Sequence, residues 1–253
     1  MKLKAKNALV YGAGGAVGSA VARAFAREGA KVFLAGRTRA SLEVVAKDIR
    51  GAGGVAETVQ TDAFDEQAVE RCTASVFEKA GSIDIQFNAV GFASHQGKAL
   101  IDLPLNEFSF PIEAWTKTQF LTARTAARYM LKKRSGVILM LSASPARLAI
   151  PLTAGFGVAC AAIEGLSRTF AAELGPEGIR VICVRPHRIG ETIPAPRESG
   201  SGDAEMRALL KLTLLGRLPT LADVANAAAF LASDQANAMT ATVANLTCGC
   251  SVD

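Results

Sequence analysis

The sequence lacks the features that identify several classes of protein. Its five cysteines are odd in number and form no Cys-x-x-Cys pair, which argues against a disulfide scaffold or metal cluster and favours a reduced, cytoplasmic protein. No stretch approaches the ~18 consecutive apolar residues of a membrane span. The 28 basic and 23 acidic side chains form no basic stripe, so the net charge of +5 favours an anionic small molecule over nucleic acid as the ligand. We therefore expect no membrane, metal or nucleic acid partner.

Size and apolar content, in contrast, are sufficient for one large core. The chain has 253 residues, of which 50% are hydrophobic, and short apolar runs alternate with longer helix-period segments along it. Because parallel strands need crossover helices, which cover both faces of the sheet, this alternation predicts a single-domain α/β protein with a doubly wound parallel sheet of about seven strands. We expect strands at 7–11, 31–35, 55–60, 84–88, 137–141, 179–184 and 242–247. We expect helices at 17–27, 41–50, 66–79, 153–174 and 220–231, and a long one ending near residue 133.

A glycine-rich turn joins the first expected strand to the first expected helix. At this position unpaired backbone N–H groups and the positive end of the helix dipole favour a pyrophosphate. Glycine-rich turns also occur for steric reasons alone, so the strand-turn-helix context is what supports the prediction. The residues expected to hold the phosphates of a nicotinamide dinucleotide are Gly12, Gly14, Gly15, Ala16, Val17 and Gly18.

The ends of the next strands predict where the adenosine half would lie. After the second strand, an acidic residue would bind the 2′-hydroxyl of NAD, but the chain has Gly36 and Arg37, which leave room and positive charge for a 2′-phosphate. NADP is therefore expected rather than NAD, and a solvated surface arginine is the alternative. The further residues expected beside the adenosine, at the ends of the third and fourth strands, are Asp62, Ala63, Asn88 and Ala89.

Several segments together resemble a known family. The cofactor turn has the form Gly12-x-x-x-Ala16-x-Gly18, and the other segments are residue 62 and residues 88–91, 171–174, 179–181, 215–218 and 230–234. Over essentially the whole chain they resemble the short-chain dehydrogenase/reductase family. The resemblance implies one Rossmann-like domain over residues 1–253, an oxidoreductase acting on a small-molecule substrate, and a homo-oligomer, often a tetramer. It also implies that Pro186 lies beside the nicotinamide.

The catalytic residues of that family are Asn, Ser, Tyr and Lys. The resemblance assigns these four roles to Trp115, Ala143, Phe156 and Cys160, so none of the family's residues is present. Lysine beneath a phenyl ring would have no phenolate to stabilise, and a neutral cysteine avoids the cost of a poorly paired ammonium. We expect a more apolar pocket lined by Trp115, Phe156 and Cys160, with ordinary core packing as the alternative.

Three side chains are candidates to replace the missing proton donor. His187 follows Pro186, where the family usually has a glycine beside the nicotinamide, and an imidazole there would reach a substrate. Ser142 and Ser144 flank the lost serine position. A local hydrogen bond is the structural alternative for His187.

The sequence leaves three functions open. The first is an NADP-dependent oxidoreductase with unusual proton handling, and the second is a dinucleotide-binding pseudoenzyme or partner subunit without turnover. The third is a non-redox isomerase or dehydratase that uses the apolar pocket. Residues 189–203 contain two prolines, three glycines and no apolar period, so we expect a mobile substrate loop near 188–212.

Overall fold

The protein forms a seven-stranded parallel sheet in which β2 and β3 lie on one side of β1 and the later strands lie on the other side. A computed structural model describes residues 1–92, 96–193 and 201–252, with only the backbone given for 201–205. The order across the sheet is β3-β2-β1-β4-β5-β6-β7, and every neighbouring pair is parallel. The strands are β1 (Asn7–Tyr11), β2 (Lys31–Gly36), β3 (Val55–Gln60), β4 (Ile85–Asn88), β5 (Gly136–Leu141), β6 (Ile179–Pro186) and β7 (Thr242–Leu246). This arrangement confirms the predicted single-domain, doubly wound Rossmann-like fold.

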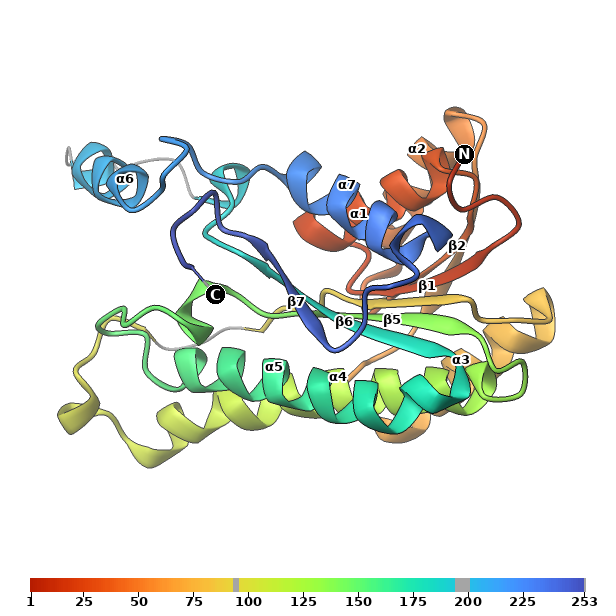
Figure 1. Cartoon of the computed structure of the whole chain (residues 1–253), viewed down its shortest axis with the longest axis horizontal. Coiled ribbons are helices and arrows are strands. Elements are labelled where there is room, and N and C mark those ends of the chain that lie inside the picture. Colours follow the sequence, from red (N-terminus) through yellow and green to blue (C-terminus); the bar gives the residue numbers. More distant parts are fainter. Residues whose placement is uncertain (93–95, 194–200, 253) are drawn as a thin grey trace.

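Helices cover both faces of the sheet (Figure 1). One face carries α1 (Ala16–Arg27), α2 (Arg39–Gly51) and α7 (Leu221–Ala232), and the other carries α3 (Glu66–Ala80), α4 (Leu105–Met130) and α5 (Gly155–Leu174). Helix α6 (Ser201–Lys211) lies apart, at one end of the molecule. Short 3₁₀ turns lie at Leu100–Asp102, Ser144–Ala146, Gly175–Glu177, Gly190–Thr192 and Asp234–Ala236. Within the described ranges, no helix has both the length and the apolar content that crossing a bilayer would require.

The inner strands of the sheet are buried on both faces, whereas the edge strands β3 and β7 are largely half-buried, and alternate side chains of the inner strands enter two different cores. On β1, Ala8 and Val10 pack toward one core, whereas Leu9 and Tyr11 pack toward the other. Strand β5 repeats the pattern over its whole length, and all six of its residues are buried. Because side chains of a strand alternate between faces, such continuous apolar runs are what a sheet covered on both sides requires.

Several element bounds, such as those of α2 and α5, differ by one or two residues from the prediction, and three further differences concern β6, α4 and α6. Strand β6 continues two residues beyond the expected end, because Arg185 and Pro186 pair with Asn245 and Leu246 of β7. Helix α4 ends at Met130, a few residues before the expected end near 133. Helix α6 was not predicted, because its helix-forming residues follow a stretch rich in proline and glycine. Of the substrate loop expected near 188–212, Gly190–Thr192 form a 3₁₀ turn, helix α6 occupies the C-terminal part, and residues 194–200 lie outside the described residues.

Candidate cofactor and active site

The turn between β1 and α1 requires glycine at two positions. Gly12 has a φ of +71°, and a Cβ there would lie 2.5 Å from the carbonyl oxygen of Ala89. A Cβ at Gly18 would overlap the carbonyl oxygen of Gly12. Helix α1 begins at Ala16, and its N-cap Gly15 makes no side-chain capping bond. The N–H groups of the first turn of α1 are therefore not occupied by a side-chain cap and are available to an anion.

A cavity of about 330 Å³ opens beside this turn, at the carboxyl ends of β1, β2, β3 and β4. The residues predicted to bind the dinucleotide that line it are Gly12, Gly14, Gly15, Arg37, Asp62, Ala63 and Ala89. The other predicted residues border it rather than line it: Ala16, Val17 and Gly18 lie in the first turn of α1, and Asn88 is the last residue of β4. Pro186, at the end of β6, lies away from it across the sheet.

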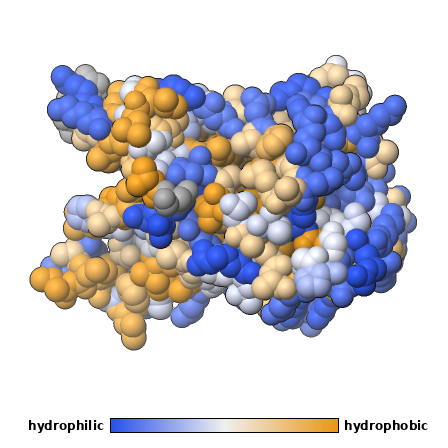
Figure 2. All heavy atoms as spheres, viewed as in Figure 1, coloured by the Kyte–Doolittle hydropathy of each residue, from blue (hydrophilic) through white to orange (hydrophobic). Residues whose placement is uncertain are grey.

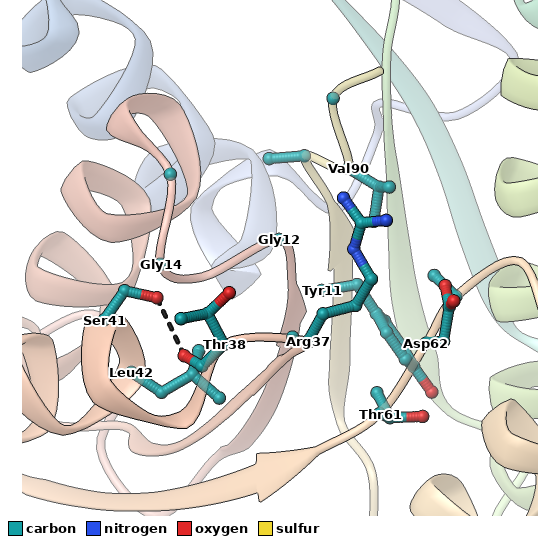
Figure 3. A pocket seen from close by; sticks show the side chains of 15 residues that line it. Tyr11, Gly12, Gly14, Arg37, Thr38, Ser41, Leu42, Thr61, Asp62 and Val90 are labelled. Atoms are coloured by element: carbon teal, nitrogen blue, oxygen red, sulfur yellow. Dashed lines mark hydrogen bonds between the residues drawn. The ribbon is translucent and has the colours of Figure 1, made fainter. Parts of the chain in front are cut away.

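Arg37 extends over this cavity. Figure 3 shows its guanidinium pointing toward Val90, with Asp62 on the neighbouring strand end nearby. Gly36, just before it, adds no side chain to the floor. Thr38 and Ser41 also line the cavity, and the Ser41 hydroxyl donates to the Thr38 carbonyl oxygen at 2.8 Å. These two hydroxyl residues were not predicted from the sequence, although their position shortly after Arg37 was a usable signal.

Asn88 supports the cavity from behind. It is fully buried, and its amide donates to the Thr122 hydroxyl at 3.0 Å. Its side-chain oxygen accepts a bond of 2.8 Å from the N–H of Val90, which lines the cavity. The side chain therefore fixes the backbone that follows β4, which is a positioning role.

A second cavity, of about 390 Å³, lies at the carboxyl ends of β5 and β6. Ala143 and Phe156, at the positions assigned to the family's serine and tyrosine, line it. Trp115 does not line it, because its ring stacks on Phe156 from behind, with centroids 5.3 Å apart and planes at 12°. Cys160 is fully buried. The expected apolar lining is thus corrected: of Trp115, Phe156 and Cys160, only Phe156 faces this cavity.

Two groups near this cavity are unsuited to proton transfer. Burial raises the pKa of the Cys160 thiol to about 12, so it stays a neutral thiol at physiological pH. The Ser142 hydroxyl donates to Glu164 at 3.0 Å, and this carboxylate lies 3.6 Å from the guanidinium of buried Arg185. Ser142 therefore belongs to a buried polar cluster and does not line the cavity.

Ser144 and His187 come together in the structure. They lie 43 residues apart, yet the Ser144 hydroxyl is 2.7 Å from Nδ1 of His187. The imidazole is 4% exposed and lines the second cavity, and its burial, helped by the positive charge of Arg188, lowers its pKa. Of the sequence candidates for a replacement proton donor, these two are the ones that line the cavity.

The two tyrosines of the chain lie elsewhere. The Tyr11 hydroxyl is within 2.8 Å of the Thr73 hydroxyl inside the core, and burial raises the pKa of this phenol well above its usual value. Tyr129 packs against Phe77 near the end of α4, with centroids 4.7 Å apart, and the Lys132 ammonium lies over its ring. Neither lines the second cavity.

Comparisons with known proteins agree with this architecture. A family model described as enoyl-(acyl carrier protein) reductase matches residues 12–251. A relative named short chain aldehyde dehydrogenase 1, from Euphorbia lathyris, is 31% identical over 245 residues, covering 93% of this chain and 84% of the relative.

Two solved structures have the same fold. A dehydrogenase/reductase from Sinorhizobium meliloti 1021 superposes with a TM-score of 0.86 at 26% identity, covering 99% of this chain and 97% of that one. An NAD⁺-bound xylitol dehydrogenase superposes with a TM-score of 0.88 at 25% identity, covering 96% of this chain and 98% of that one. The chain therefore belongs to the short-chain dehydrogenase/reductase family of NAD(P)-binding oxidoreductases.

Proposed function

We propose that this chain is an NADP-dependent oxidoreductase in which groups other than the family's tyrosine and lysine handle the substrate proton. The observation that carries the proposal is the cavity at the carboxyl ends of β1 to β4, with Arg37 extended over it. A dinucleotide spans two halves of such a sheet. The second cavity, at the ends of β5 and β6, lies on the other side of β1, where the nicotinamide half would bind.

The residues of the first cavity fit the adenosine and phosphate groups. A side chain at Gly12 or Gly18 would overlap backbone atoms or distort the turn, so the turn between β1 and α1 requires glycine at both positions. Gly36 followed by Arg37 leaves space and positive charge for a 2′-phosphate, in place of a carboxylate for a 2′-hydroxyl. Thr38 and Ser41 add hydroxyl groups beside the guanidinium.

Each part of the chain then has a separate task. The bound dinucleotide supplies or accepts the hydride of the reaction. The first turn of α1 and Arg37 would hold its phosphates, and Asn88, which accepts a bond from the N–H of Val90, would keep the loop after β4 in place beside it. The apolar wall containing Phe156 excludes water from the reacting carbon.

The test is calorimetric titration of the full chain with NADPH and with NADH. We expect NADPH to bind with micromolar affinity and NADH at least about 10-fold more weakly, since only NADPH can pair with Arg37. Absence of binding for both dinucleotides would overturn the proposal. Equal affinities would overturn the preference for NADP alone.

A dinucleotide-binding protein without turnover is the second candidate. It is favoured by the occupants of the tyrosine and lysine positions, which are a phenyl ring and a fully buried thiol with a pKa of about 12. Both candidates require NADPH binding, so oxidation of NADPH with a broad set of carbonyl and enone substrates separates them. Tight binding with no substrate-dependent oxidation would select the second candidate.

A further inference from the structure

The second cavity contains one histidine nitrogen whose hydrogen-bonding capacity is unused. Nδ1 of His187 is 2.7 Å from the Ser144 hydroxyl. Nε2 of the same ring is buried and has no hydrogen-bond partner among the described residues. Leaving a buried polar atom unpaired costs about 1–3 kcal/mol, so such atoms in native proteins usually meet a ligand or water.

The sheet itself builds this pair. Leu141 of β5 pairs with Val184 of β6, and Ser144 and His187 each lie three residues further along. The two loops therefore leave the sheet side by side and bring the hydroxyl against the imidazole. Because the carboxyl ends of parallel strands form the ligand edge of such a sheet, the pair lies where a substrate would bind.

We infer that His187 is the catalytic acid and base of this enzyme, that Ser144 sets its tautomer, and that its substrate is an apolar secondary alcohol or ketone. This inference rests on the proposed oxidoreductase function. It assigns the proton transfer to two positions that hold no catalytic residue in the family pattern.

A serine hydroxyl suits the partner role because it both donates and accepts. When Ser144 accepts a bond from Nδ1–H, Nε2 carries a lone pair and acts as a base. When Ser144 donates to Nδ1, the neutral ring carries its proton on Nε2 and donates a hydrogen bond to a ketone oxygen. Protonation of the alkoxide uses the imidazolium, whose Nδ1–H donates to the Ser144 oxygen while Nε2 gives up its proton. The pair therefore serves both directions of an alcohol–ketone reaction without a tyrosine or lysine.

The chemistry balances in the direction of alcohol oxidation. The O–H bond of the alcohol breaks and its proton goes to Nε2 of His187, while the C–H bond breaks and its electron pair leaves as hydride for the oxidised dinucleotide. The carbon–oxygen double bond forms, and the imidazolium later releases its proton to solvent. Ketone reduction is the reverse, with Nε2 protonating the alkoxide oxygen.

The cavity lining determines the substrate class. Its volume of about 390 Å³ is within the usual range for small-molecule sites. Its walls include the apolar side chains of Pro145, Ile150, Phe156 and Leu209. Figure 2 shows hydrophobic residues gathered at this end of the molecule, around α6 and the segments that precede α4 and α5. The polar side chains of Gln96, Thr153 and Arg188 also line the cavity, so its lining fits a ligand with an apolar body and at least one oxygen.

Burial of the ring favours its neutral, base form at neutral pH. Burial lowers the pKa of His187 below its ordinary 6.5, and Arg188, the charged residue among the described lining, lowers it further. Oxidation should therefore proceed at pH 7 and fall as the pH drops through this lowered pKa, since the imidazolium cannot accept a proton.

The test uses the full chain without cofactor and reads the imidazole directly. The chain has two histidines, so a His95→Gln background leaves the ¹⁵N resonances of His187 alone in the spectrum. Camphor, cyclohexanone and acetophenone serve as ketone probes. We expect an apparent pKa below 6.5, a shift of the Nε2 resonance with at least one probe, and a changed tautomer ratio in Ser144→Ala that Ser144→Thr reverses. An Nε2 resonance that no probe moves, or a ring that titrates at 6.5, would overturn the inference.

Kinetics provide a second readout. His187→Gln keeps a hydrogen-bonding side chain but cannot carry the proton, so turnover should fall about 10²- to 10⁴-fold while NADPH affinity stays within about twofold. Unchanged turnover in this variant would refute the role of His187. Calorimetry with NADPH on the same samples separates the two hypotheses: binding with an unresponsive imidazole refutes only the inference, whereas a responsive imidazole without NADPH binding refutes the proposed function.

Discussion

Replacing Arg37 with alanine tests cofactor selection at a single side chain. No ion pair or side-chain hydrogen bond of Arg37 is found among the described residues, so its guanidinium is available to a ligand over the cavity. The side chain is also exposed, and removing it should change the free energy of unfolding by less than about 0.5 kcal/mol. Any effect on binding is then an effect on the ligand contact.

The expected loss follows from the bonds that a 2′-phosphate would make. Hydrogen bonds to charged groups contribute about 1.5–3 kcal/mol, which corresponds to a roughly 10- to 150-fold weaker Kd for NADPH. NADH carries no 2′-phosphate, so its Kd should change by less than about twofold. The preference between the two dinucleotides should therefore collapse in Arg37→Ala.

Calorimetric titration of wild type, Arg37→Ala and Arg39→Ala with both dinucleotides measures this directly. Arg39 is the matched control, because it is exposed, begins α2 and does not line the cavity. Its replacement should leave both affinities unchanged. Equal losses for NADPH and NADH in Arg37→Ala, or an equal loss for NADPH in both variants, would refute the assignment of a 2′-phosphate site to Arg37.

Three other substitutions test the scaffold. Gly18→Ala places a Cβ against a backbone carbonyl oxygen, so NADPH affinity should fall at least about 10-fold. Gly165→Ala is the control on α5, because a Cβ there meets only a distant side chain; it should leave NADPH binding unchanged and raise stability by about 0.5–1 kcal/mol. Glu164→Gln removes the carboxylate charge that lies 3.6 Å from the buried guanidinium of Arg185, and a loss of up to about 3–5 kcal/mol should lower Tm by up to about 6–20 °C in calorimetry. Asp223, held by Arg217 and its capping bonds, has a pKa lowered to about 2, so its stabilising effect is present above pH 3.8 and disappears as the pH falls toward 2. Asp223→Asn should therefore be less stable than wild type at pH 7 but similar near pH 2, and a Tm difference that persists in acid would contradict this expectation. An unchanged Tm for Glu164→Gln would contradict the second prediction, and wild-type NADPH affinity in Gly18→Ala would contradict the first.

The sheet was predictable because its information is local. Each buried strand is a short apolar run, and the alternation with helical segments leaves few topologies to choose from. The ends of β1 and β3 agree with the prediction to the residue. Helix α6 was missed because the proline- and glycine-rich segment before it hides its start, and the extension of β6 depends on pairing with β7, which the sequence of β6 alone does not contain.

The first and second cavities also differ in how far the sequence alone could predict them. The location of Gly12, Gly18 and Arg37 around the first cavity was predictable because the turn and the strand end each act within a few residues, and their contact with a dinucleotide stays a prediction. The contact between Ser144 and His187 was not, because strand register joins residues that are far apart in the chain. Trp115 was misjudged as a lining residue, since only the packed structure reveals that its ring stacks behind Phe156.

A crystal structure of the full chain with NADPH is the most direct test of the central claim. We expect the 2′-phosphate at the Arg37 guanidinium, the pyrophosphate at the first turn of α1, and the nicotinamide ring in the cavity between Phe156 and His187. A dinucleotide bound elsewhere, or density for its adenosine half in the first cavity with the nicotinamide turned out into solvent, would contradict it.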